Sequence, residues 1–348
     1  MQGRSTWQFL ALCIALTTSV PSGAEDTVQS GLYDVGGHRL HLHCEGWGSP
    51  TIVFENGLAG LSLEWRPLQR ELARFTRTCV YDRAGYGMSD AGPMPRTVER
   101  ITSDLHHLLV AAEVPAPYLF VAHSFGGYTA QLYARRHPAN VDGVVLVDAS
   151  HPAQHAVFPL QLGHTCEAVA QRRTYGWVVN PKLARNYPAE FTDTARNYMR
   201  QNKMIEATVS EMCEFARGGE MLQAAGPFPA KRLLVITRGQ QPFPVTPRGN
   251  YLETKWQQFQ EDLASSVPGA AHVIALHSGH HVHFDQPGLI TQLVSNSVML
   301  SRMERDYGET RSAWALQGIV GEAGDGRPVV EVLDVIRPVL FNANAVPH

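Results

Sequence analysis

The stretch "VAHSFGGYTA", residues 121–130, places Ser124 between a histidine and a phenylalanine, with two glycines close behind it. The apolar run over 118–122 predicts a buried strand, and a helix is expected to begin near Gly126. So sharp a turn strains the backbone of its central residue, and the small residues Ala122 and Gly126 let the two segments approach each other. The serine hydroxyl would then project above the sheet, beside the positive end of the helix dipole. The stretch therefore predicts that Ser124 is a nucleophile.

Apolar runs of strand length alternate with helical patterns along the rest of the chain. This alternation is typical of an α/β protein with a mostly parallel central sheet flanked by helices. Helical spacing of apolar residues is evident between 98 and 109 and again between 256 and 263. The predicted strands are 39–44, 51–55, 78–81, 118–122, 143–148, 233–237 and 272–277.

The pattern changes between 151 and 229, where no strand is evident and segments such as 191–215 look helical. We interpret 151–229 as a helical lid inserted into a core formed by 25–150 and 230–300. Residues 301–348 form a C-terminal extension, and the helical spacing of apolar residues from Val329 predicts a helix docked on the core.

The first 24 residues are typical of a secretory signal peptide. Arg4 is followed by an apolar stretch over 9–16 and by small residues at 22–24. The apolar stretch is shorter than the roughly 20 residues that a membrane-spanning helix needs. We therefore expect an exported protein, periplasmic or secreted, with no membrane span once the signal is removed.

Export would place the cysteines in an oxidising compartment. Removal of the signal leaves Cys44, Cys79, Cys166 and Cys213. We expect Cys44 to pair with Cys79 and Cys166 with Cys213, with four buried free thiols as the alternative.

The formal net charge of −3 and the scattered charges of both signs offer no basic stripe for nucleic acid.

Several of these motifs together resemble the α/β-hydrolase superfamily. Residues 122–127, "AHSFGG", stand where that superfamily has its nucleophile elbow, with Ala122 where glycine is usual. The resemblance extends over about 32–300 and includes "TIVFENGLAG", "VYDRAGYGMSD" and "SGHHVHFDQP". It implies that the backbone amides of Phe125 and Leu58 form the oxyanion hole, with Asn56 and Gly57 in the loop that carries the second donor.

The resemblance also implies a histidine base after the last core strand. His280 follows Gly279 in the expected pattern, and His281 and His283 are its competitors. His281 and His283 alternate like metal ligands on a strand, but no third ligand stands at a diagnostic spacing. We expect neither a metal nor another cofactor.

The acid that orients the base is not at its usual place, because "RGQQPFP" after strand 233–237 contains no carboxylate. Asp148, at the end of strand 143–148, is the preferred candidate, and it keeps the chain order serine, acid, histidine. Glu253 and Asp262 are the alternatives. Asp82 and Arg83 are expected to brace a tight turn.

A Ser124, Asp148 and His280 triad predicts a serine hydrolase that cleaves a carboxylic ester, with a small ester-like molecule as its substrate. The same triad also serves lactone, carbon–carbon bond and perhydrolase chemistry. A protein of another class, which binds a ligand on the hydrolase fold without turning it over, is the second hypothesis.

Overall fold

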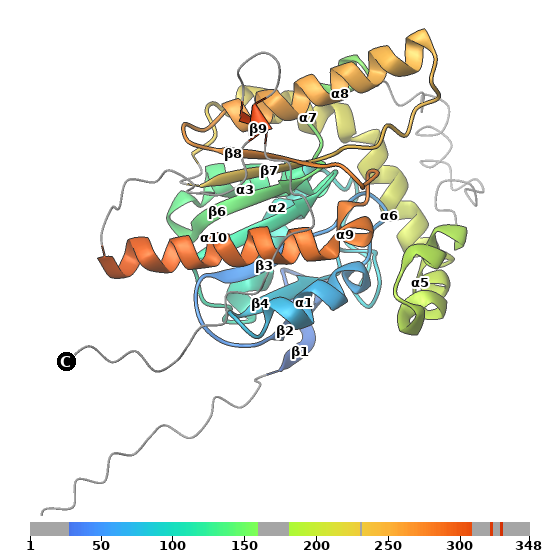
Figure 1. Ribbon diagram of the computed structural model, residues 1–348. Coiled ribbons are helices and arrows are strands. Elements are labelled where there is room, and N and C mark those ends of the chain that lie inside the picture. The colour runs from blue at the N-terminus through green and yellow to red at the C-terminus, as the bar shows by residue number, and fades with distance from the viewer. Residues whose placement is uncertain (1–27, 159–180, 230–231, 308–320, 323–327, 330–348) are drawn as a thin grey trace, which may run out of the picture.

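The computed structural model describes residues 28–158, 181–229, 232–307, 321–322 and 328–329, and an eight-stranded sheet forms its centre (Figure 1). The strand order is β1-β2-β4-β3-β5-β6-β7-β8. Strands β1 and β2 are antiparallel and β2 is antiparallel to β4, whereas all later neighbours are parallel. The strands are β1 Gln29–Asp34, β2 Arg39–Glu45, β3 Thr51–Glu55, β4 Thr78–Tyr81, β5 Tyr118–His123, β6 Val141–Val147, β7 Leu233–Arg238 and β8 Ala271–Ala275.

This topology confirms the predicted α/β class with its mostly parallel sheet. The predicted strands lie within a few residues of the observed ones, and the structure adds β1 at the edge. Side chains of β1 alternate between exposed and half-buried, so this strand lacks the apolar run that marked the others.

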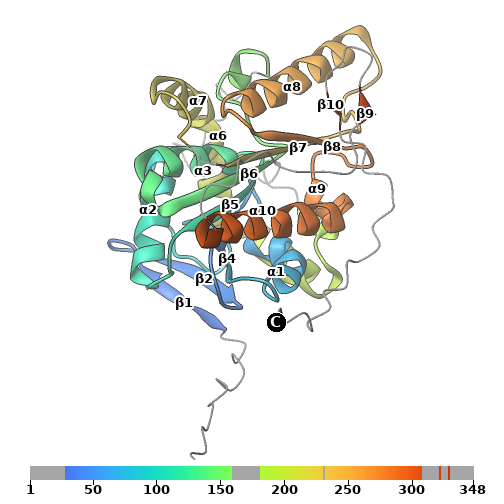
Figure 2. The same ribbon diagram turned by 60° about the vertical axis from the view of Figure 1, so that its left-hand side comes forward.

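Helices cover both faces of the sheet (Figure 2). Helices α2 Val98–Ala111, α3 Gly126–Arg136 and α8 Pro247–Ser265 pack on one face, where Leu105, Tyr133 and Leu263 join the core. Helices α1 Arg66–Leu72 and α10 Pro287–Tyr307 pack on the other face. The central strands are buried on both sides, which explains their continuous apolar runs.

The segment between β6 and β7 is helical in its described part. It contains α5 Thr192–Met199, α6 Asn202–Cys213 and α7 Phe215–Ala224, and no strand occurs among its described residues, 151–158 and 181–229. Because it leaves β6 at the carboxyl edge of the sheet, it begins beside the place where polar side chains from several strands meet.

The ends of the chain are described only in part. Helix α10 continues to Tyr307, beyond the core boundary expected at residue 300. Strand β10 Pro328–Val329 pairs with β9 Gly321–Glu322, so Val329 itself lies in a strand. The rest of the helix predicted from Val329 falls outside the described residues and stays a prediction. Residues 1–24 and 330–348 lie outside the described residues.

Within the described part, no helix has both the length and the apolar character needed to cross a membrane.

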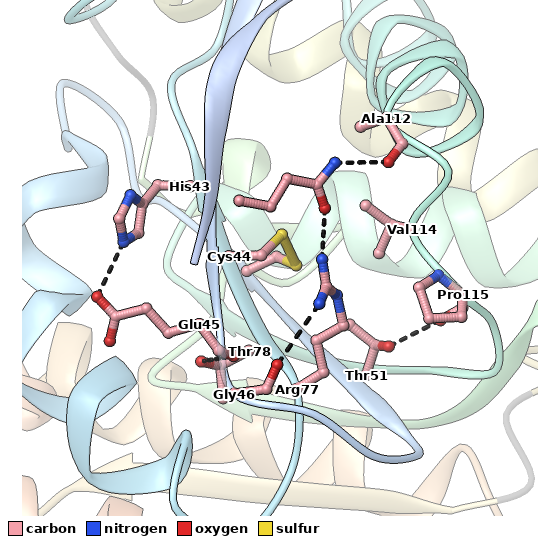
Figure 3. Close-up of a disulfide and its surroundings, with 12 residues drawn as sticks. His43, Cys44, Glu45, Gly46, Thr51, Arg77, Thr78, Ala112, Val114 and Pro115 are labelled. Atoms are coloured by element: carbon pink, nitrogen blue, oxygen red, sulfur yellow. Dashed lines mark hydrogen bonds and ion pairs between the residues drawn. A yellow bond between two sulfur atoms is a disulfide. The ribbon is translucent and has the colours of Figure 1, made fainter. Parts of the chain in front are cut away.

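A disulfide between Cys44 and Cys79 joins neighbouring strands β2 and β4 (Figure 3), as the sequence predicted. The two residues stand directly opposite each other, with their Cα atoms 4.1 Å apart, and both are fully buried in the core. Cys213 is also disulfide-bonded. Cys166 lies outside the described residues, so the pairing of Cys166 with Cys213 stays a prediction.

Candidate active site

Ser124 occupies the sharp turn between β5 and α3. Its φ angle is +50°, in the left-handed region that side chains other than glycine rarely adopt. Its amide donates to the Val147 carbonyl (3.2 Å), and its own carbonyl accepts from the amides of Gly127 and Ser150 (both 3.0 Å). A Cβ at Gly126 would lie only 2.7 Å from a carbonyl oxygen of the loop after β3, so the close approach needs glycine.

His280 follows β8 and lies between Ser124 and Asp148. Its Nε2 is 3.0 Å from Ser124 Oγ, and its Nδ1 is 2.6 Å from Asp148 Oδ2. Since an ionised carboxylate can only accept, Nδ1 carries the proton and Nε2 is left to accept from the serine hydroxyl. The His280 side chain is 32% exposed, whereas the Asp148 side chain is fully buried.

The two competing histidines, His281 and His283, are not part of the hydrogen-bonded chain. Burial lowers the pKa of His281 to about 4. The ring of His283 is fully buried and stacks on Trp65, with the centroids 4.5 Å apart. Among the described residues, neither histidine has a hydrogen bond to Ser124 or Asp148, so the geometry selects His280.

Asp148 is held by more than the histidine. Trp256 Nε1 donates to Oδ1 (2.7 Å), and Arg238 donates to the carboxylate from its amide (3.2 Å) and from Nη1 (2.9 Å). Burial by itself would raise the pKa of Asp148, but the hydrogen bond and charge of His280 and the charge of Arg238 outweigh it and hold the pKa below its ordinary value. Asp148 is therefore an ionised acceptor for His280.

The alternative acids do not contact His280. Glu253 pairs with Arg238 Nη2 (2.8 Å) and accepts from Gln257 Nε2 (2.8 Å). Asp262 is exposed on α8. Sequence reasoning missed the roles of Arg238 and Trp256, because Arg238 was only the first residue after the predicted strand 233–237 and Trp256 only an apolar position of a predicted helix.

The loop after β3 lies directly against Ser124. A Cβ on Gly57 would come within 3.3 Å of Ser124 Cβ. The amides of Leu58 and Phe125, the two expected oxyanion donors, have no acceptor among the described residues. The Asn56 side chain instead donates to the Tyr81 carbonyl (3.0 Å) and holds the loop on β4.

Asp82 braces its own turn, as expected, whereas Arg83 braces the loop after β3. Asp82 accepts from the amides of Ser62 (3.0 Å) and Met88 (3.1 Å). Arg83 donates to the carbonyls of Asn56 (2.7 Å) and Gly57 (2.8 Å).

Together these groups can take a proton from a serine hydroxyl, stabilise the charged imidazole and present two backbone amides to an oxyanion. All of them come from segments at the carboxyl edge of the sheet or just beyond it.

Comparison with known sequences agrees with this architecture. The sequence model of the Alpha/beta hydrolase family matches residues 46–293. The uncharacterized protein YqjL of Bacillus subtilis is 26% identical over 260 residues, which cover 74% of this chain and 87% of that protein. A haloalkane dehalogenase of Sphingobium indicum is 29% identical over 144 residues, which cover 40% of this chain and 48% of that protein. Other curated relatives are matched over 20 to 40% of their own length.

Solved structures share the fold. The enol-lactonase from Burkholderia xenovorans LB400 superposes with a TM-score of 0.56 at 23% identity, over 77% of this chain and 100% of that chain. An esterase from Exiguobacterium antarcticum superposes with a TM-score of 0.57 at 17% identity, over 79% of this chain and 100% of that chain.

Proposed function

This chain belongs to the alpha/beta hydrolase family, and we propose that it is a serine hydrolase that cleaves a carboxylic ester through an acyl-enzyme. The observation that carries the proposal is the continuous hydrogen-bonded chain from Ser124 Oγ through His280 to Asp148. Its three members are far apart in the sequence, and each occupies the role for which its chemistry suits it: nucleophile, base and orienting acid.

In the first step, Ser124 Oγ attacks the ester carbonyl carbon while His280 Nε2 takes the hydroxyl proton. Asp148 stabilises the imidazolium that forms, and its buried bonds to Arg238 and Trp256 hold the carboxylate in one orientation. His280 then gives the proton to the departing alkoxide, which leaves as the alcohol. The acyl group remains bound to Ser124.

The amides of Leu58 and Phe125 stabilise the tetrahedral oxyanion in this step and again in the second. In the second step His280 takes a proton from water, the resulting nucleophile attacks the acyl carbon, and the carboxylic acid is released as Ser124 regains its proton.

We further propose an uncharged, small ester as the substrate, with the segment 151–229 acting as a lid that selects the acyl group. The protein is exported to the periplasm or secreted. The buried Cys44–Cys79 disulfide is compatible with an oxidising compartment, and the first 24 residues have the composition of a signal peptide.

Fluorophosphonate labelling of the mature protein tests the proposal, together with turnover of short-chain p-nitrophenyl esters. Wild type should label and turn over, and Ser124→Ala should lose both. Ser297→Ala is the matched control, because Ser297 is a buried serine of α10 whose hydroxyl, within the described residues, bonds only the Leu293 carbonyl of its own helix (2.8 Å). A wild-type protein that neither labels nor hydrolyses would instead support the ligand-binding hypothesis.

A further inference from the structure

A second group of ionisable side chains lies next to the loop after β3, which carries Gly57 and the Leu58 amide and is called the oxyanion loop below. This group takes no part in the proposed triad. Glu64, His123 and His283 come from three separate segments, and one ligand atom of each lies within 4.8 Å of the others. All three side chains are buried. Glu64 belongs to the short helix Ser62–Trp65, His123 ends β5 and His283 lies on α9 Val282–Asp285.

Hydrogen bonding sets the protonation of His123. Its Nε2 lies 2.9 Å from the carbonyl of His280, so Nε2 is the protonated nitrogen that donates. Its Nδ1 therefore carries a lone pair, and this buried atom has no hydrogen-bond partner within the described residues. A buried acceptor without a donor costs free energy unless another species binds it.

The other two members are unsatisfied as well. Both ring nitrogens of His283 and Oε1 of Glu64 are buried and lack a partner in the described part of the chain. Glu64 Oε2 has one long hydrogen bond, from the Tyr187 hydroxyl at 3.4 Å. One ligand atom from each of the three side chains therefore lies in the same small buried region, and each residue has at least one buried polar atom without a hydrogen-bond partner among the described residues.

The donor atoms of the cluster suit a transition-metal ion. Two neutral imidazoles and one carboxylate are the donors that Zn²⁺ and related divalent transition metals prefer.

We propose that Glu64, His123 and His283 form a binding site for one divalent transition-metal ion, with Zn²⁺ as the best fit. In tetrahedral coordination, Zn–N and Zn–O bonds of about 2.0–2.2 Å place the ligand atoms about 3.4 Å apart. The ligand atoms now lie within 4.8 Å of one another, and His283 Nε2 and Glu64 Oε1 are 4.0 Å apart, so binding requires the three side chains to move inward.

The proposed metal site lies directly against the oxyanion loop and would stabilise it. A Cβ on Gly57 would lie 2.7 Å from His123 Nδ1, and one on Gly60 would lie 2.7 Å from Glu64 Oε1. The ion would therefore link this loop to the residue that precedes Ser124, which gives it a structural role next to the reacting groups.

The test uses tag-free mature protein in the Ser124→Ala background, so binding is measured without any dependence on turnover. The protein is purified from cultures supplemented with Zn²⁺ and its metal content is measured; chelator-treated protein is then titrated with Co²⁺ and followed by its visible d–d bands. One equivalent of metal is expected, with Co²⁺ bands of an ion with four or five ligands. Glu64→Gln and His283→Phe should each weaken binding by at least about 100-fold.

His106→Asn is the control, because the His106 ring stacks on His137 with centroids 3.9 Å apart and could hold an adventitious ion. The proposal is overturned by protein that holds no stoichiometric metal from either preparation, or by equal binding in the Glu64 variant. Retained metal in the His283 variant but none in the His106 variant would overturn it too. Because labelling of wild type by a fluorophosphonate is a separate readout, failure of this site leaves the serine hydrolase proposal untouched.

Discussion

Arg83 and Glu211 form a buried ion pair that joins the loop after β4 to helix α6 across 128 residues of sequence. Nε lies 2.9 Å from Oε1 and Nη2 lies 3.0 Å from Oε2. The same guanidinium donates to the carbonyls of Asn56 and Gly57. The inserted helix therefore helps to set the loop that carries the Leu58 amide.

Glu211→Gln should lower both stability and turnover. The variant leaves a buried guanidinium without its counter-charge, and we expect the free energy of unfolding to fall by about 2–4 kcal/mol. We also expect kcat to fall about 10-fold with little change in KM, because a displaced amide weakens binding of the oxyanion more than binding of the ester. Urea unfolding and ester kinetics measure the two effects.

Glu214→Gln is the control, since Glu214 lies just beyond the same helix and makes only a 3.6 Å pair with the exposed Arg217. It should change stability by no more than about 0.5 kcal/mol. An unchanged kcat in folded Glu211→Gln would mean that the ion pair is structural only.

Two adjacent histidines should behave very differently. His280→Gln removes the group that bonds Ser124, and kcat/KM should fall at least about 1,000-fold with loss of fluorophosphonate labelling. His281→Gln should keep kcat/KM within about tenfold. Steady-state kinetics of both variants measures these losses. A larger loss of kcat/KM in His281→Gln than in His280→Gln would make His281 the base.

Asp148→Asn should keep the fold but present the wrong group to His280. The amide donor at this position favours the imidazole tautomer in which Nε2 carries the proton, so it cannot accept from Ser124. We expect kcat to fall by about 1,000-fold or more. Glu253→Gln, which loses only a pair with Arg238, should cost less than about tenfold. A larger fall in kcat for Glu253→Gln than for Asp148→Asn would make Glu253 the orienting acid.

The stability of the fold should depend on pH through Glu55. Burial raises the pKa of Glu55 from 4.5 to about 7, although Arg83 and the Tyr81 hydroxyl act against the rise. Because the folded-state pKa lies above that of the unfolded chain, this contribution to stability is complete below about pH 4.5 and is lost as the pH rises to about 7.

Glu55→Gln should remove that dependence. Relative to this variant, wild type should lose up to about 3 kcal/mol of unfolding free energy between these pH values. Urea unfolding at a series of pH values gives the difference curve. Exposed Glu71→Gln serves as the control, and a flat difference between wild type and Glu55→Gln would contradict the assignment.

The disulfide between β2 and β4 should stabilise the fold appreciably. A Cys44→Ala, Cys79→Ala double variant opens a link between residues 35 apart in sequence and leaves two small cavities in the core. We expect a loss of about 2–5 kcal/mol in unfolding free energy. Denaturant unfolding of variant and wild type under non-reducing conditions checks this, and equal midpoints would show that the bond contributes nothing.

Much of the site could be predicted from local pattern. The apolar run before Ser124 and the glycines after it predicted the strand, the turn and the helix that the structure contains. His280 and Asp148 could be proposed because each stands at the end of a predicted strand or just after it. The edge strand β1 was not predicted, because a half-exposed strand has no continuous apolar run.

Other groups could not be found in this way. Trp256 and Arg238 bond Asp148 from a helix and a strand whose patterns indicated only burial. The alternation of His281 with His283 suggested a metal pair. Their ring centroids lie 5.8 Å apart, but only His283 forms a possible ligand group, with Glu64 and His123, which are far away in the sequence.

The amino-acid sequence by itself determined the class of fold, the strands β2 to β8 along the chain and the strained turn at Ser124, because periodicity and turn chemistry act between near neighbours. Tertiary structure alone decided which histidine faces the serine and which acid faces that histidine. It also decided that Arg83 meets Glu211 and that three buried ligands converge beneath the oxyanion loop. These contacts join residues that only the packing of a parallel sheet brings to one edge, and no local pattern records which side chains will meet there.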